Sequence, residues 1–293
     1  MSARGIDVVR AHLAKIPPAT TVAEKRAQYD RAERVFPVPA DVAVKTVQVP
    51  GAAEWLEPPA AREGAAVLYL HGGGYVIGSP RSHRHLAAAI GRAARTSVLL
   101  PDYRLAPEHP FPAAVEDAVA AYRWLLGRGQ SPGRVVLAGD SAGGGLTVAT
   151  LLALRERGMP LPAAGVCISP WVDLTFGGGS YATKAASDPI VTREGVMEMA
   201  RAYVAQGDPR APLVSPLFAD LRGLPPLLIQ VGSEEVLLDD AVVLADRAKA
   251  AGVETSLEVW PAMIHVWHWF LPMLDEAQTA IDKIGDFVLA KTK

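Results

Sequence analysis

The stretch Val135-Val136-Leu137-Ala138-Gly139-Asp140-Ser141-Ala142-Gly143 decides the fold class and contains the first candidate functional residue. Four apolar residues suited to a buried strand run directly into a Gly-x-Ser-x-Gly pattern, which opens a helical stretch. The two glycines allow a turn so sharp that larger side chains would collide with neighbouring backbone. Ser141 is forced into a strained conformation there, which lifts its hydroxyl out of the turn. The pattern therefore predicts a strand, a tight turn and a helix, with a nucleophile at the turn.

The chain from residue 65 onward repeats this alternation of short apolar runs and longer helical patterns. Such alternation is typical of a parallel sheet with crossover helices. The expected strands are 65–70, 97–101, 134–138, 164–169, 227–231 and 256–260, with antiparallel edge strands at 42–49 and 54–56. The expected helices are 83–95, 113–126, 142–157, 240–251 and one from residue 274. We therefore predict an α/β fold with a mostly parallel central sheet, flanked by helices, that binds ligands at the carboxyl ends of its strands.

Two segments do not fit the alternation. Residues 1–40 contain apolar residues at helical spacing followed by a mixed-charge helix at 22–35, and residues 175–212 contain three consecutive glycines and a helix at 193–205. We interpret both segments as a helical cap over the site, and residues 41–174 and 213–293 as the core. The alternative for the first segment is a helix docked on the sheet far from any site.

Composition limits the partners of this chain. Half of its 293 residues are apolar, a fifth are charged, and the formal net charge is -2. This small negative net charge produces no electrostatic field that would attract polyanions, so we expect neither a nucleic-acid partner nor stable membrane association. No apolar stretch reaches the ~18 residues that span a bilayer, and residues 1–18 lack the apolar core of a secretory signal. The single cysteine, Cys167, allows no internal disulfide, so we expect a cytoplasmic protein.

The string His71-Gly72-Gly73-Gly74 follows another apolar run and supplies candidate donors for an oxyanion hole. Acyl transfer builds negative charge on the carbonyl oxygen, and fixed N–H donors aimed at that oxygen lower the barrier by ~3 kcal/mol each. We expect the N–H groups of Gly72, Gly73 and Ala142 to be these donors, the last at a helix N-terminus. His71 is interpreted as a brace for the loop. The alternative, a phosphate-binding loop, lacks the Lys-Ser/Thr ending and the dinucleotide spacing that such loops need.

A serine hydroxyl is a weak nucleophile at neutral pH and needs an imidazole to accept its proton. In a fold of this order the base comes last in the chain, and only His265 and His268 lie beyond Ser141. We predict His265 as the base, because it lies nearer to the end of the preceding strand. His268 is the alternative, although we expect it to begin the next helix. The remaining histidines are interpreted as surface or structural residues: His12, His83, His85 and His109.

An acid must orient the imidazole and stabilise its charged form. It should follow the strand at 227–231, where the candidates are Glu234, Glu235, Asp239 and Asp240. We favour Glu235 and keep Asp239 as the second choice. Asp239 and Asp240 are also well placed to cap the next helix.

Together these motifs resemble the bacterial hormone-sensitive-lipase family of esterases, in its Gly-Asp-Ser-Ala-Gly branch, which has the α/β-hydrolase fold. The resemblance extends from about residue 67 to about residue 269. It includes Asp102-Tyr103-Arg104-Leu105-Ala106-Pro107-Glu108, Phe111-Pro112-Ala113-Ala114-Val115-Glu116-Asp117, Ser169-Pro170-Trp171-Val172-Asp173-Leu174 and Asp188-Pro189. The resemblance places the acid on Glu235, where many members carry aspartate.

The resemblance implies a serine carboxylesterase that acts on small-molecule esters with short to medium acyl chains, at ~C4 to C6. It implies an acyl-enzyme formed through Ser141, His265 and Glu235, no cofactor and no metal, and a homodimer as in several members. The same residues serve amide, carbamate and lactone hydrolysis, so these reactions are the closest alternatives. A non-catalytic small-molecule receptor is a further alternative, against which the intact Ser141, Glu235 and His265 argue.

Overall fold

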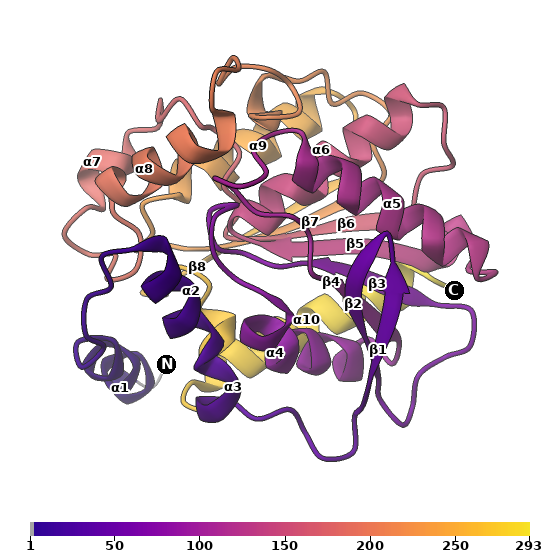
Figure 1. The fold of residues 1–293 in the computed structure, drawn as a ribbon, viewed down its shortest axis with the longest axis horizontal. Coiled ribbons are helices and arrows are strands. Elements are labelled where there is room, and N and C mark those ends of the chain that lie inside the picture. Colours follow the sequence, from indigo (N-terminus) through magenta and orange to yellow (C-terminus); the bar gives the residue numbers. More distant parts are fainter. Residues whose placement is uncertain (1–2) are drawn as a thin grey trace.

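A computed structural model describes residues 3–293 of the chain. Its strands are β1 (Ala43–Val49), β2 (Gly51–Glu57), β3 (Ala66–Leu70), β4 (Ser97–Pro101), β5 (Val135–Asp140), β6 (Ala164–Ile168), β7 (Leu227–Gly232) and β8 (Thr255–Trp260). They form one sheet in the order β1-β2-β4-β3-β5-β6-β7-β8 (Figure 1). β2 pairs antiparallel with both β1 and β4, whereas every other neighbouring pair is parallel. The predicted mostly parallel sheet with antiparallel strands at one edge is confirmed.

The burial of the strands explains their composition. β3 to β7 are buried along their whole length, because helices cover both faces of a parallel sheet, and their sequences are nearly continuous apolar runs. β8 lies at the edge of the sheet and is only partly buried. The antiparallel hairpin of β1 and β2 forms the opposite edge, and most of β1 is exposed.

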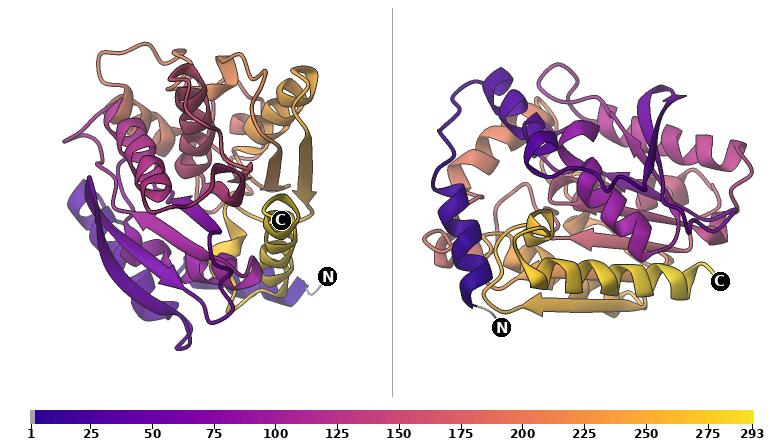
Figure 2. Two further views of the ribbon diagram at one scale, coloured as in Figure 1. Left: turned by 90° about the vertical axis from the view of Figure 1, so that its right-hand side faces the viewer. Right: turned by 90° about the horizontal axis from the view of Figure 1, so that it is seen from below.

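The helices form two layers around the sheet (Figures 1 and 2). The longer ones are α4 (Pro80–Ala93), α5 (Ala113–Gly127), α6 (Ala142–Glu156), α9 (Leu238–Ala250) and α10 (Asp275–Lys291). α4 and α10 pack together on one face, and α5, α6 and α9 cover the other. No helix within residues 3–293 combines the length and the apolar character needed to cross a membrane.

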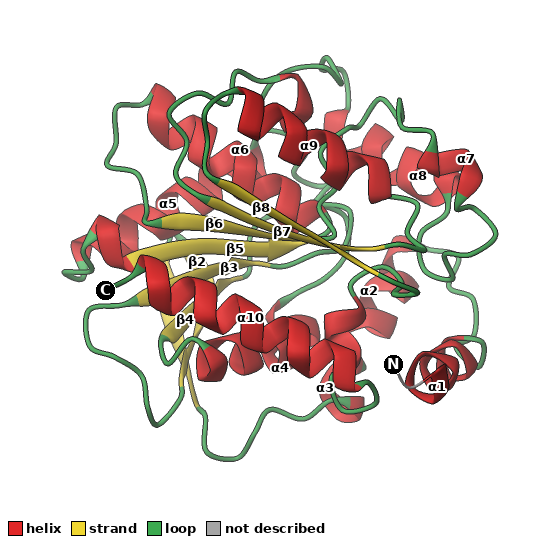
Figure 3. Cartoon of the chain, turned by 180° about the vertical axis from the view of Figure 1, so that it is seen from behind, coloured by secondary structure: helices red, strands yellow, loops and turns green. Residues whose placement is uncertain are grey.

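The remaining helices belong to the two segments outside the alternation. They are α1 (Ala3–Leu13), α2 (Val22–Asp30), α3 (Ala32–Val35), α7 (Ser180–Thr183) and α8 (Arg193–Val204), and three short 3-10 helices are η1 (Pro132–Arg134), η2 (Pro216–Phe218) and η3 (Trp267–Phe270). α1, α2, α7 and α8 lie at the carboxyl ends of the parallel strands (Figure 3). The single helix expected at 22–35 is wrong, because the helix is interrupted at Arg31 and continues as α3.

Side chains of α2 fix this helix to both the loop after β3 and the second segment. Arg26 donates through Nε to the carbonyl oxygen of Val76 at 2.8 Å and forms an ion pair with Glu108 at 2.7 Å. Lys25 forms an ion pair with Glu198 of α8 at 3.0 Å. The two segments therefore meet above the ends of the strands.

Candidate active site

Ser141 lies on a strained turn between β5 and α6. Its φ is 55° and its ψ is -122°, a left-handed backbone that a residue with a side chain rarely adopts. Glycine is required at both flanking positions because neighbouring backbone atoms lie too close to leave room for a Cβ. A Cβ on Gly139 would overlap the carbonyl oxygen of Gly143, and one on Gly143 would overlap the carbonyl oxygen of Leu70. The steric reason for the Gly-x-Ser-x-Gly pattern is therefore visible in the backbone around this turn.

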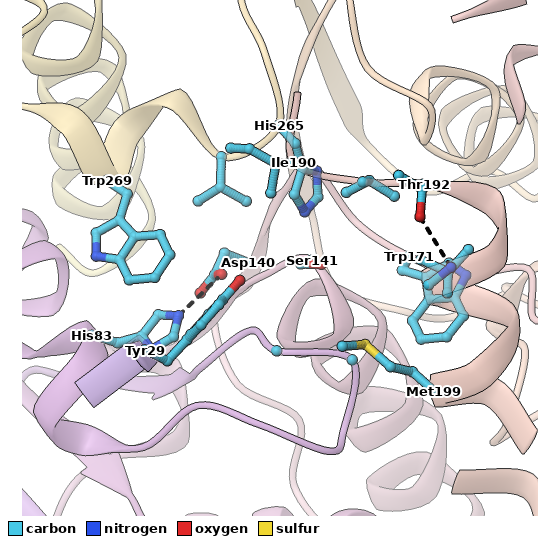
Figure 4. A pocket seen from close by; sticks show the side chains of 16 residues that line it. Tyr29, His83, Asp140, Ser141, Trp171, Ile190, Thr192, Met199, His265 and Trp269 are labelled. Carbon is cyan, nitrogen blue, oxygen red and sulfur yellow. Dashed lines mark hydrogen bonds and ion pairs between the residues drawn. The ribbon is translucent and has the colours of Figure 1, made fainter. Parts of the chain in front are cut away.

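His265 and Glu235 form a buried pair that follows β8 and β7. The Nδ1 atom of His265 lies 2.9 Å from Oε2 of Glu235, and the two side chains are 5% and 0% exposed. A carboxylate only accepts, so Nδ1 carries the proton and Nε2 is left as the basic nitrogen. Burial opposes the charged imidazole, but the hydrogen bond and the charge of Glu235 outweigh it and raise the pKa of His265 above its ordinary value. Figure 4 shows this imidazole directed toward Ser141.

Ser169 connects the loops that carry the acid and the base. Its hydroxyl donates to Oε1 of Glu235 at 2.7 Å and accepts from the backbone N–H of Val266 at 3.1 Å. The N–H of Gly232 also donates to Oε1 of Glu235, at 2.6 Å. These bonds orient the carboxylate so that Oε2 faces the imidazole. The run containing Ser169 was noted in the sequence, but this role depends on a contact across 66 residues.

The loop after β3 uses one of its three glycine amides for its own structure. The N–H of Gly72 donates to Oδ1 of Asp140 at 3.0 Å, so the prediction that Gly72 is an oxyanion donor is wrong. The N–H groups of Gly73 and Gly74 have no hydrogen-bond acceptor among residues 3–293. Both glycines line the same pocket as Ser141. Gly73 has a φ of 115°, a conformation open to glycine alone.

Asp140, next to the serine, is the centre of a buried polar cluster. Besides Gly72, it accepts from the hydroxyl of Tyr69 at 2.8 Å and lies 3.4 Å from Nε2 of His83. Burial favours the neutral acid, but His83 and Tyr69 outweigh it and hold the pKa of Asp140 below its ordinary value. The carboxylate thus holds the loop after β3 against the turn that presents the serine. From the sequence, Asp140 stands out only as part of the Gly-Asp-Ser-Ala-Gly motif, which indicates no role for its side chain.

The pocket at this site has a volume of about 110 Å³ and includes Ser141, His265 and the two glycines in its walls. The first segment contributes Tyr29 from α2. The second contributes residues from Ile190 to Met199, around the start of α8, and Trp269 follows His265 (Figure 4). Tyr29 and Met199 were not identified as pocket residues from the sequence, because their positions depend on how the two segments fold over the sheet.

The alternative candidates lie elsewhere. His268 is buried in η3, where its Nε2 meets the side-chain oxygen of Gln230 at 2.7 Å, and burial lowers its pKa to about 3. Asp239 accepts from the N–H of Ser180 at 2.9 Å, and Asp240 accepts from the N–H groups of Val172 and Asp173. Neither aspartate contacts His265. Within residues 3–293 no three acidic, histidine or cysteine side chains are grouped as metal ligands.

His71 and His85 occupy structural positions. The ring of His71 stacks on Tyr103 with centroids 4.2 Å apart, and its Nδ1 lies 2.8 Å from the carbonyl oxygen of Gly72. His85 meets the carbonyl oxygen of Trp269 at 3.0 Å. Burial lowers the pKa of both imidazoles to about 3, so both stay neutral at physiological pH.

The sheet order, with a serine on a strained turn after β5 and an acid–histidine pair after β7 and β8, defines an α/β hydrolase. Comparison with known proteins agrees, since a family model described as alpha/beta hydrolase fold matches residues 67–269. The acetyl-hydrolase of Streptomyces hygroscopicus is 54% identical over 92% of this chain and 91% of its own length.

Solved structures narrow the class further. The crystal structure of an esterase from the bacterial hormone-sensitive lipase family has a TM-score of 0.97 and 51% identity, and the match covers 100% of both chains. The esterase EstE5, in crystals soaked with p-nitrophenyl butyrate, gives a TM-score of 0.95 at 46% identity over 100% of this chain and 99% of its own. The chain belongs to the bacterial hormone-sensitive-lipase family of esterases and is a carboxylic-ester hydrolase.

Proposed function

We propose that Ser141 is the nucleophile of this esterase, with His265 as its general base and Glu235 as the acid that orients the base. The observation that carries the proposal is the placement of Ser141 and His265 in the walls of one pocket, with Glu235 bonded to the far nitrogen of the imidazole. The raised pKa of His265 supports its role, because a stronger base accepts the serine proton more readily.

The reaction has two halves. The Oγ of Ser141 bonds to the ester carbonyl carbon while Nε2 of His265 takes the serine proton. The tetrahedral intermediate then breaks the bond to the alcohol oxygen, which leaves with the proton from His265. A water molecule repeats the sequence on the acyl-enzyme, with His265 again as base, and releases the carboxylic acid and the free serine.

The developing negative charge on the carbonyl oxygen would be held by the N–H groups of Gly73, Gly74 and Ala142. Gly73 and Gly74 line the pocket, and Ala142 is the first residue of α6, where N–H groups lack partners within the helix. The positive end of the helix dipole adds to this stabilisation. Each donor aimed at the oxygen contributes ~3 kcal/mol to lowering the barrier.

Residues 1–40 and 175–212 would form the cap over the core made by 41–174 and 213–293. Tyr29 from the first and Ile190 from the second lie in the pocket wall, which supports this division; residues 1–2 lie outside the described part of the chain. The small volume of about 110 Å³ favours short to medium acyl chains at Ser141. A cytoplasmic location and a homodimer belong to the same proposal, and light scattering on the purified protein tests the latter.

The deciding experiment compares Ser141→Ala with Ser131→Ala, a substitution at an exposed serine outside the site. We expect Ser141→Ala to abolish hydrolysis of p-nitrophenyl butyrate and labelling by a fluorophosphonate, while its circular dichroism spectrum is unchanged. Ser131→Ala should behave as the wild type. Turnover retained by Ser141→Ala would exclude this serine as the nucleophile.

A further inference from the structure

A second and larger hollow lies beside the catalytic pocket, beneath the N-terminal helices. Its volume is about 470 Å³, against about 110 Å³ for the pocket at Ser141. We call it the tail groove; its apolar wall includes Leu13, Ile16, Ala32, Val35, Phe36 and Phe270. Within this wall Phe36 and Phe270 are buried, whereas Val35 is 46% exposed and lies toward solvent.

The tail groove and the catalytic pocket share three wall residues, Tyr29, Ile190 and Trp269. The rings of Tyr29 and Trp269 lie with centroids 5.0 Å apart. A chain that starts at Ser141 and outgrows the small pocket therefore meets these three side chains, and the apolar groove lies directly behind them.

Resting on the proposed function, we propose that the tail groove binds the distal part of a long acyl chain whose carbonyl lies at Ser141. The chain passes between Tyr29, Ile190 and Trp269. The acyl half of the ester stays attached to Ser141 until water releases it, whereas the alcohol departs first. A groove that shares its wall with the pocket at Ser141 suits the half that stays.

The character of the groove fits a hydrocarbon chain. Its charged groups, Lys15 and Arg31, are exposed and leave the apolar wall free. Each methylene removed from water contributes ~0.8 kcal/mol, which corresponds to about a fourfold gain in kcat/KM when the gain is kept in the transition state. Two or three methylenes in the groove would thus change the relative rate by more than tenfold.

The test measures the ratio of kcat/KM for p-nitrophenyl decanoate to that for p-nitrophenyl butyrate. Val35→Trp places an indole in the groove and should lower this ratio by about tenfold or more. Ala27→Trp is the matched control, since Ala27 is exposed on α2 outside the groove, and it should leave the ratio unchanged. Ile190→Ala widens the passage and should raise the ratio about fourfold. A ratio that Val35→Trp and Ile190→Ala both leave unaltered overturns the proposal.

Two further measurements distinguish failure of this proposal from failure of the proposed function. Decyl butyrate carries its long chain on the alcohol; if Val35→Trp slows this ester and spares the decanoate, the groove holds the alcohol half and the proposal is wrong. Calorimetry of decanoate binding to Ser141→Ala, with and without Val35→Trp, needs no turnover. We expect Val35→Trp to weaken that binding about tenfold, so the groove is tested even if Ser141 proves not to be the nucleophile. Equal decanoate affinity in both proteins overturns the proposal.

Discussion

The backbone N–H of Gly72 donates to the carboxylate of Asp140 at 3.0 Å, so the residue before Ser141 holds the glycine loop in place. Asp140 is buried, and its other oxygen lies 3.4 Å from Nε2 of His83. One carboxylate therefore fixes the distance between Ser141, the proposed nucleophile, and the loop that supplies two of the proposed oxyanion donors.

We expect Asp140→Asn to lower kcat for p-nitrophenyl butyrate by about tenfold to a hundredfold, with a smaller change in KM. The neutral amide is a weaker acceptor than the carboxylate, and its N–H₂ group faces one of the three groups that donate to Asp140. The loop after β3 is then held less firmly, and the proposed oxyanion donors, each worth ~3 kcal/mol, are displaced from the carbonyl oxygen. Tyr69→Phe removes only one donor to the same carboxylate and should cost less. Steady-state kinetics of both variants checks the order, and an unaffected kcat in Asp140→Asn would contradict it.

The assignment of the acid is tested by Glu235→Gln and Asp239→Asn. Glu235→Gln should reduce kcat by about 10⁴-fold, because the amide no longer fixes the tautomer or stabilises the charged imidazole. Asp239→Asn alters only the contact with Ser180, so its kcat should stay within a few-fold of the wild type. A larger loss in Asp239→Asn than in Glu235→Gln would reverse the assignment.

The pH dependence follows from the raised pKa of His265. As the proposed base, His265 must be neutral to accept the serine proton, so kcat/KM should fall as the pH drops through this pKa. Because Glu235 raises the pKa, the midpoint of the acidic limb should lie above that of an ordinary imidazole. In Glu235→Gln the residual activity should have its acidic midpoint at lower pH. The dependence of kcat/KM on pH, measured for both proteins with p-nitrophenyl butyrate at a wavelength where the absorbance of the product is independent of pH, gives the two midpoints. A higher acidic midpoint in Glu235→Gln than in the wild type would contradict this prediction.

Ser169→Ala should damage both stability and rate. The substitution leaves the Val266 N–H and one oxygen of Glu235 without their shared partner in a buried place, at a cost of ~1–3 kcal/mol in the free energy of unfolding. The carboxylate then holds the imidazole less firmly, and we expect kcat to fall about tenfold. Urea denaturation and kinetics measure the two effects. Ser233→Ala, whose hydroxyl accepts from the N–H of Ala262 in a less buried loop, is the control.

The fold and the turn at Ser141 could be predicted from sequence because local sterics and periodicity determine them. The apolar run of β5, the two glycines and the following helical pattern are all within about 25 residues of one another. The pairing of Glu235 with His265, found at 2.9 Å, could be anticipated because both residues follow neighbouring strands at the same edge of the sheet.

What the sequence did not predict depends on contacts between distant segments. Gly72 was assigned to the oxyanion hole because nothing local shows that Asp140, 68 residues away, accepts its N–H. Nothing in the sequence indicates that Met199 lines the pocket, because this depends on how α8 turns the side chain toward Gly74. The break at Arg31 likewise has no strong local signal such as glycine or proline.

The position of β8 at the edge of the sheet has a consequence for how this enzyme loses activity. The serine turn follows β5, which has paired neighbours on both sides, whereas the loop with His265 follows a strand that is held on one side only. Local opening of an edge strand costs less free energy than opening of a central one. We therefore expect mild heating or denaturant to displace His265, the proposed base, before the sheet unfolds, so that activity is lost before the β-structure.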